Sequence, residues 1–225
     1  TSEELELASE ELERLGVFSN RDFAHPLYRE VALSGVTLEQ RRLLARRAID
    51  ALQADPESAA QFLDDAELEP SIALELLERA ARITGAAGNE LRAARLQAKA
   101  VAYAIGERRA TLAFEAARVL DKADRPEAMR LLRISLEEQP RHTETIFWLA
   151  GYYADLGQSG EVERLLSRIS DDEKALLGWI KRQISLRFAL GDYAGVLQRW
   201  EAESRLHSDP DPILAYNVGF ARSLQ

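Results

Sequence analysis

Residues 146–166 have the sequence IFWLAGYYADLGQSGEVERLL, and this stretch decides the fold. In its first half, Ile146, Leu149 and Tyr153 recur at intervals of three and four residues, which places them on one face of a helix. Gly157 then marks a turn, because glycine readily adopts the left-handed conformation that ends many helices. Apolar residues at helical spacing resume beyond the turn. The stretch therefore predicts two antiparallel helices joined as a hairpin.

The same register recurs around three more predicted turns. The four turns are separated by 35, 34 and 34 residues and fall at Gly88, Ala123, Gly157 and Gly191. A small residue or isoleucine precedes each turn by seven positions: Ala81, Ala116, Ala150 and Ile184. A small or β-branched residue follows each turn by five positions, and a further residue lies four beyond it: Ala93 and Gln97, Ala128 and Leu132, Val162 and Leu166, Val196 and Trp200. A period of about 34 residues indicates stacked helix hairpins, in which small residues let helices approach closely and each hairpin covers the next.

The rest of the chain also reads as helices separated by short breaks containing Gly, Asp, Asn or Pro. We therefore expect an all-α protein, with a superhelical array of antiparallel helix hairpins over residues 70–225. Residues 172–190 are expected to form one of its helices. Residues 1–69 are expected to form a separate N-terminal junction segment. Within it, apolar pairs around a Ser-Asn turn predict a short β-hairpin near residues 17–24.

The array resembles the tetratricopeptide-repeat family. In that family's 34-residue unit, the first helix carries a large apolar residue, a leucine followed by a small residue, and an aromatic residue, and a Gly-Asp-like turn and an alanine follow. Ile146, Leu149, Ala150 and Tyr153 match this order, and the resemblance covers about residues 70–225. The copies are degenerate, since Thr84, Arg187 and Gln97 replace usual family residues. A neighbouring helical-repeat family is the alternative.

The N-terminal segment resembles a different family. Phe23–Val31, with the sequence FAHPLYREV, is followed by the basic, Ala-rich stretch Leu43–Ile49. Together they are similar to the junction between a winged-helix segment and a helical-repeat array in bacterial STAND-type signal-transduction ATPases, many of which regulate transcription. Two ordinary amphipathic helices are the alternative. The resemblance implies that the ATPase would lie upstream, because the chain has no Gly-x-x-x-x-Gly-Lys-Ser/Thr motif to cradle a phosphate.

Charge and composition narrow the function classes. The chain has 29 basic and 38 acidic residues and a net charge of -9, which argues against direct nucleic-acid binding. The arginines of residues 41–47 are more simply explained as a solvated face or as partners for acidic residues of the same chain. There is no cysteine, and no apolar run approaches the roughly 20 residues needed to span a bilayer. We expect a cytoplasmic protein without membrane contact.

No pattern in the sequence indicates catalysis. The three histidines, His25, His142 and His207, lack the spacing of a metal site, so we predict no metal, no cofactor and no catalytic residues. The acidic runs at 171–173 and 209–212 are suited to the starts of helices, where carboxylates are favoured by the helix dipole. Nucleophile elbows of the Gly-x-Ser-x-Gly kind are absent.

The family resemblance implies a binding face instead. Tetratricopeptide arrays bind on a concave surface lined by the first helix of each hairpin. Transferring the register predicts that this surface is formed by Glu78, Arg82, Phe147, Gly151, Asp155, Lys181, Arg182 and Ser185, with Tyr216 and Asn217 nearby. The Lys and Asn set that some arrays use to clamp a terminal carboxylate is not reproduced. An internal peptide segment, a partner protein or a small polar effector would each suit this face, and self-association is a further alternative.

Two functional hypotheses follow. The first is a non-catalytic module for protein–protein interaction or effector sensing within a larger bacterial regulatory protein. The second is a free-standing scaffold or chaperone-like adaptor. An enzyme built on a helical superhelix would need a deep pocket with an acid of perturbed pKa. The gene on either side of this segment distinguishes the first two.

Overall fold

The structure is a computed structural model that describes residues 7, 10–15, 17–19, 22–23, 34–174, 176–203, 206–208 and 211–224. It is all-α apart from one small hairpin. The chain divides into two compact units, one comprising residues 1–69 and the other residues 70–225. Within the described part of the chain, no helix combines the length and apolar character needed to cross a membrane.

The first unit contains the hairpin and several short helices. Strands β1 (Phe18–Ser19) and β2 (Asp22–Phe23) pair antiparallel, with Phe18 opposite Phe23, so the expected hairpin is present. Residues 24–31 of the FAHPLYREV motif lie outside the described residues. The described helices of this unit with assigned bounds are α3 (Leu38–Ala51), α4 (Pro56–Ala59), the 3₁₀ turn η1 (Ala60–Phe62) and α5 (Leu63–Ala66).

Helix α3 begins with the two reciprocal hydrogen bonds of a capping box. The Thr37 hydroxyl accepts from the Gln40 amide at 3.2 Å, and the Gln40 side chain accepts from the Thr37 amide at 2.9 Å. Farther along α3, Arg46 donates to the main-chain oxygens of Ala66 and Glu67 at the end of α5, and Arg42 pairs with the Glu67 carboxylate. Two of the arginines in residues 41–47 therefore bind a neighbouring segment of the same chain, which supports their interpretation as intramolecular partners.

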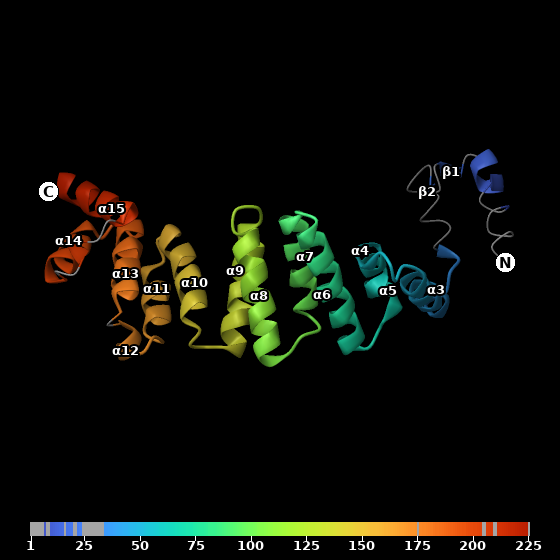
Figure 1. The fold of residues 1–225 in the computed structure, drawn as a ribbon, viewed down its shortest axis with the longest axis horizontal. Coiled ribbons are helices and arrows are strands. Elements are labelled where there is room, and N and C mark those ends of the chain that lie inside the picture. Colours follow the sequence, from blue (N-terminus) through green and yellow to red (C-terminus); the bar gives the residue numbers. More distant parts are fainter. Residues whose placement is uncertain are drawn as a thin grey trace. The chain divides into compact units, whose positions relative to one another are not determined.

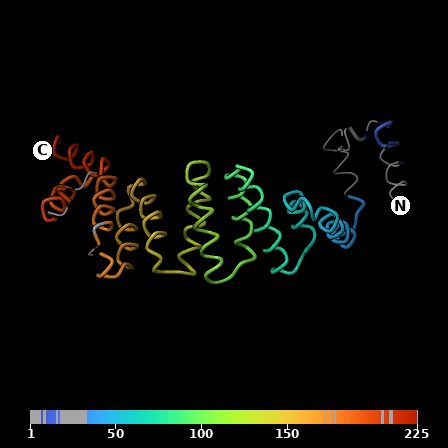
Figure 2. The backbone as a smooth tube through the Cα atoms, viewed as in Figure 1, coloured from blue at the N-terminus to red at the C-terminus, as the bar shows by residue number. Residues whose placement is uncertain are grey.

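The second unit is a succession of helices, visible from green to red in Figure 1. They are α6 (Pro70–Ala86), α7 (Glu90–Ala100), α8 (Gly106–Leu120), α9 (Arg125–Glu138), α10 (Thr143–Asp155), α11 (Ser159–Leu166), α12 (Asp171–Lys174), α13 (Leu177–Ala189), α14 (Tyr193–Ala202) and α15 (Pro212–Ser223). From α6 to α11 each helix packs against the next along the chain, and the backbone trace in Figure 2 runs up and down accordingly. In addition, α10 packs against α13, and α13 packs against both α14 and α15.

Small residues fill the contacts between these helices. Ala116 on α8 and Ala128 on α9 are both fully buried, as is Ala150 on α10. A methyl side chain at these positions lets the helix axes approach closely. The larger residues expected to fill the gap toward the next hairpin behave less uniformly. Leu132 is fully buried, whereas Leu166 and Trp200 are half-buried.

Three of the four predicted turns share one geometry. Gly88, Gly157 and Gly191 have φ of 84°, 69° and 74°, in the left-handed region that glycine tolerates. After each of them, the next amide donates to the carbonyl five residues earlier: Asn89 to Thr84, Gln158 to Tyr153 and Asp192 to Arg187. This is the Schellman closure of a helix end. Ala123 is different, because the Asp124 amide there bonds only four residues back, to Leu120.

The largest departure from the predicted helices is the break in residues 172–190. The structure has α12 and α13 there, with Leu176 extended at φ -70° and ψ 139°. The Glu173 carboxylate accepts from the Ser170 amide at 3.2 Å and from the Thr143 hydroxyl at 2.5 Å. Helix α12 ends at Lys174, and α13 begins at Leu177 after the extended Leu176, so the prediction of one continuous helix was wrong.

Candidate functional site

Helix α10 has a partly accessible edge beside its buried inner face. The helix begins at His142, whose Nδ1 accepts from the Thr145 amide at 3.4 Å. Ile146 and Ala150 are fully buried and fix the inner face. Four residues apart, Phe147, Gly151 and Asp155 follow a different edge of the same helix. Phe147 is only 8% exposed, whereas Gly151 is half-buried and Asp155 is exposed.

Helix α13 supplies the opposite wall. Trp179, Ile180 and Ile184 are buried and anchor this helix. The Trp179 ring packs on Phe147 of α10, with 4.9 Å between ring centroids and 55° between planes. Arg182 and Ser185, three residues apart on α13, are half-buried at the edge facing α10. The aromatic contact therefore fixes how these two edges meet.

Between α10 and α13 lies a hollow of about 460 Å³, which we call the α10/α13 hollow. Its lining includes five of the ten predicted binding residues: Phe147, Gly151, Asp155, Arg182 and Ser185. The structure also places Glu144, Trp148, Tyr152, Leu186 and Ala189 in the lining. A Cβ atom built on Gly151 meets no other atom within 4 Å, so the missing side chain leaves open space.

Charged groups at the rim of the α10/α13 hollow are paired with one another. Arg182 Nη2 lies 2.6 Å from Glu144 Oε1, and the Arg182 guanidinium carbon lies 4.6 Å from the Phe147 ring centroid. At the other end, Asp155 pairs with Arg125 of α9, and the Arg125 guanidinium lies 4.6 Å from the Tyr152 ring centroid. The charges of the rim therefore offset one another, and each of the two arginines also makes a cation–π contact with an aromatic ring.

Tyr152 is held as a hydrogen-bond donor. Its hydroxyl donates to Asp121 Oδ1 at 2.5 Å. Burial raises the pKa of the Tyr152 phenol well above its usual range, and the hydrogen bond to Asp121 raises this pKa further. The phenol is therefore protonated at neutral pH and acts in positioning the end of α10, not as a base.

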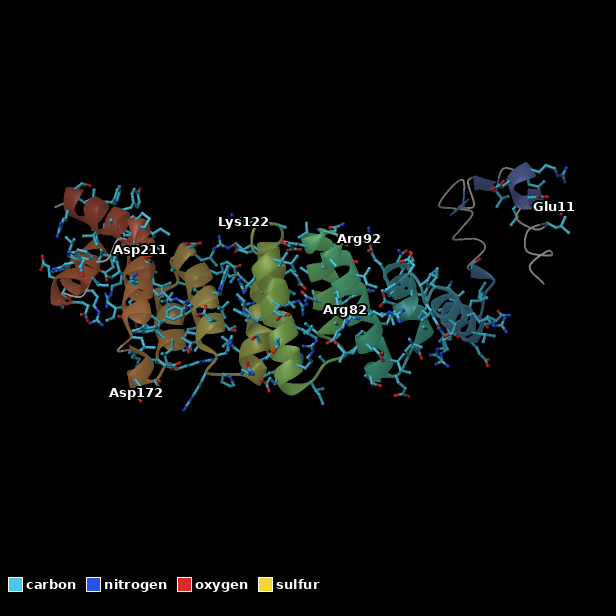
Figure 3. The ribbon with its side chains drawn as sticks, in the orientation of Figure 1. Glu11, Arg82, Arg92, Lys122, Asp172 and Asp211 are labelled. Carbon is cyan, nitrogen blue, oxygen red and sulfur yellow. The ribbon has the colours of Figure 1, made fainter. Side chains whose placement is uncertain are left out.

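Two predicted residues lie in a different hollow. Glu78 and Arg82 of α6 line a space of about 680 Å³ that α7 and α8 also border. Glu78 accepts from Arg108 of α8 at 2.7 Å, and Arg82 is labelled in Figure 3. The predicted residues that line a hollow are therefore divided between two separate hollows.

The remaining predicted residues lie toward α15. Lys181 Nζ is 3.7 Å from the carboxylate of Asp211. Asp211 caps the start of α15 and is labelled in Figure 3. Tyr216 is 63% exposed and packs edge-on against Phe188, with 6.0 Å between ring centroids. Asn217 is 5% exposed, so its side chain is on the buried side of α15 and does not line an accessible face.

Some lining residues were recoverable from the sequence and others were not. Glu144 lies three residues before Phe147, so extending the α10 edge by one turn would have found it. Trp148 is half-buried and lines the hollow, but the register of the predicted binding face does not include it. Tyr152 carries no such signal, because its place depends on the contact with Asp121, 31 positions away.

Among the residues that the structure describes, no three His, Cys, Asp or Glu side chains gather as they would around a metal ion. His142 bonds Thr145 Oγ1 at 2.6 Å and packs edge-on against Phe114, and His207 packs on Trp200. Neither histidine lines the α10/α13 hollow.

Comparison with known proteins does not assign the chain to a family. No protein-family model matches the chain, and no curated protein is significantly similar to it.

Proposed function

We propose that residues 70–225 form a tetratricopeptide-like module that binds a partner protein through an extended peptide segment. We further propose that the chain is a non-catalytic part of a larger bacterial regulatory protein. The observation that supports binding most strongly is the α10/α13 hollow, where Phe147, Gly151 and Arg182 come together from two helices.

The chemistry of the hollow favours a peptide with a large apolar side chain. Phe147, Trp148 and Leu186 supply apolar surface, and Gly151 leaves room above it. The charges at the rim already have partners, so a ligand gains little by bringing a charge of its own. A small polar effector would leave this apolar surface uncovered, which is why we favour the peptide.

The proposal can be tested with a peptide selected from a random library on the immobilised protein. Gly151→Leu should weaken that peptide's binding at least about tenfold, since burying one large apolar side chain contributes ~1.5–3 kcal/mol. Gly219→Leu on α15 is the matched control, because a Cβ there also meets nothing within 4 Å. Calorimetric titration measures both affinities. Equal affinities for the two variants would place the peptide elsewhere and refute this site.

Arg182→Ala tests the rim separately. The change removes the pair with Glu144 and the contact with the Phe147 ring, and we expect binding to weaken by about three- to tenfold. Arg182 is more informative than Lys181, which is directed toward Asp211 instead.

The regulatory half of the proposal rests on the resemblance of Phe23–Val31 to the STAND-type junction. A free-standing scaffold or chaperone-like adaptor is the alternative. Sequencing the gene on both sides of this segment separates them. An upstream phosphate-binding loop supports the regulator, and a gene without an ATPase supports the adaptor.

A further inference from the structure

A third hollow lies on the other side of helix α10. It has a volume of about 520 Å³, and helices α9 and α11 form its walls. Its floor contains Leu136, Leu149 and Leu165, whose side chains are at least 95% buried. We call it the α9/α11 hollow.

The two hollows that share α10 lie on nearly opposite faces of that helix. At 100° per residue, Leu149 and Tyr153 point about 200° and 240° around the axis from Phe147. Gly151 lies only about 40° from Phe147 by the same count. A ligand in the α9/α11 hollow therefore does not compete directly with one over Gly151.

Arginines dominate the accessible edge of the α9/α11 hollow. Three guanidinium groups, from Arg133, Arg164 and Arg168, line it together with two carboxylates, from Glu137 and Glu161. This local excess of positive charge occurs in a chain whose net charge is -9. It sets this hollow apart from the α10/α13 hollow, whose charged lining groups are paired.

The three arginines differ in how they are held. Arg164 Nη1 lies 2.9 Å from Glu161 Oε1, so these two charges offset each other. Arg133 donates to the Tyr153 hydroxyl at 3.2 Å, and this neutral partner directs the guanidinium without cancelling its charge. The backbone amide of Arg168 donates to Leu165 O at 3.1 Å, but its exposed side chain makes no hydrogen bond or ion pair with a residue that the structure describes. Arg133 and Arg168 are thus available to an anion.

We propose that the α9/α11 hollow is a second binding site, which takes a small organic anion with an apolar body. Its carboxylate or phosphate group would bind Arg133 and Arg168, because the planar guanidinium matches both anions. Its apolar body would lie on the leucine floor. The volume is within the range of small-ligand pockets.

Calorimetric titration of the whole protein with phenyl phosphate, benzoate and inorganic phosphate tests this assignment. We expect saturable binding of at least one organic anion with a Kd in the low-millimolar range or tighter, which a ligand of about ten heavy atoms can reach. Inorganic phosphate should bind more weakly because it has no apolar body. The stronger of the two organic anions identifies the head group.

Two variants make the test specific. Arg168→Gln should weaken binding about three- to tenfold, and its fold should be unaffected because the Arg168 side chain has no described partner. Glu137→Gln should strengthen binding about two- to threefold by removing an opposing charge, a gain that unfolding cannot mimic. Arg95→Gln, an exposed position on α7 outside the hollow, is the control for net charge.

The assignment is overturned by any of three results. They are the absence of saturable binding by both organic anions, equal binding of inorganic phosphate, and an Arg168→Gln affinity that matches Arg95→Gln. None of these outcomes depends on the peptide-binding proposal, since the peptide site is on the other side of α10.

Discussion

Thr145 joins two helices through a buried polar cluster. Its hydroxyl lies 2.6 Å from His142 Nδ1 and 3.2 Å from the Ser135 hydroxyl, and the Thr145 and Ser135 side chains are fully buried. Ser135 belongs to α9 and Thr145 to α10. The cluster therefore fixes the connection between the second helix of one hairpin and the first helix of the next.

Replacing Thr145 with valine should lower the free energy of unfolding by about 1–3 kcal/mol. Valine preserves the shape but leaves the Ser135 hydroxyl and the His142 ring without this partner. Urea denaturation followed by circular dichroism measures the change. Thr111→Val is the control, because its hydroxyl bonds only to Glu107 O within α8, and we expect less than about 0.5 kcal/mol there. Equal effects would mean that the cluster adds nothing.

The sequence predicted Phe147, Gly151 and Asp155 together because a single helix fixes their spacing. The sequence did not show that Lys181 and Arg182 contact different helices, or that Tyr216 is exposed while Asn217 is buried. Adjacent residues on a helix point about 100° apart, so Arg182 meets Glu144 of α10 while Lys181 faces Asp211 near α15. Which helix lies next to each of these side chains depends on tertiary packing, and the spacing of residues in the sequence does not reveal it.

At the scale of elements, the glycine turns set where each hairpin reverses. Gly157→Ala should lower stability by about 1–2 kcal/mol, because alanine is strained at a φ of 69°. Gly160→Ala, three residues later in α11, should instead raise stability by about 0.4–1 kcal/mol, since its Cβ has open space. Thermal unfolding of the two variants gives the comparison. Changes of the same sign would contradict the turn geometry.

The carboxylate that caps α14 should make the stability of the protein depend on pH. The Asp192 carboxylate accepts from the Gly195 amide at 2.9 Å and pairs with Arg187, and these contacts lower its pKa, with the backbone hydrogen bond as the main cause. A lowered pKa in the folded state means that the stabilisation is present above the unfolded value near pH 4 and is lost as pH falls below it.

Asp192→Asn should therefore reduce the melting temperature at pH 6 but have a much smaller effect at pH 3. Asparagine still caps the helix, so the variant removes the charge and keeps the cap. Melting curves from pH 3 to pH 7 measure both proteins. A difference that does not shrink as the pH falls would show that the carboxylate charge is not the cause.

Element boundaries were predictable where local chemistry defines them. The Thr37 box, the glycine ends and the Asp211 cap are encoded within four residues of each helix end. The break before α13 was not predicted, because the apolar spacing of residues 172–190 suits one helix. Gly178 was a local signal against that reading, since glycine has a low helix propensity. The contact of Glu173 with Thr143, 30 residues away, could not be read from local sequence.

At the scale of the whole molecule, ion pairs join the first helices of successive hairpins. Glu78 of α6 pairs with Arg108 of α8, and Lys181 of α13 pairs with Asp211 at the start of α15, in each case 30 residues apart. Arg109 of α8 and Glu138 of α9, 29 residues apart, instead join the two helices of one hairpin. Such partly exposed pairs contribute little stability individually. The equal spacing of the first two pairs is what a stack of similar hairpins produces.

The two units should differ in stability. The described core of residues 34–69 consists of small side chains plus Leu63, whereas residues 70–225 bury large ones such as Leu77, Leu131 and Ile184. Because apolar burial drives folding, amides of α3 should exchange at least about tenfold faster than those of α8 and α9. Hydrogen exchange of the free protein measures this, and equal protection in both units would contradict it.

Hydrogen exchange with a library-selected peptide bound tests the central claim most directly. If the partner occupies the α10/α13 hollow, α10 and α13 gain protection together, and Gly151→Leu abolishes that gain while Gly219→Leu keeps it. Protection confined to α6, α7 and α8, or unchanged in Gly151→Leu, would contradict the account.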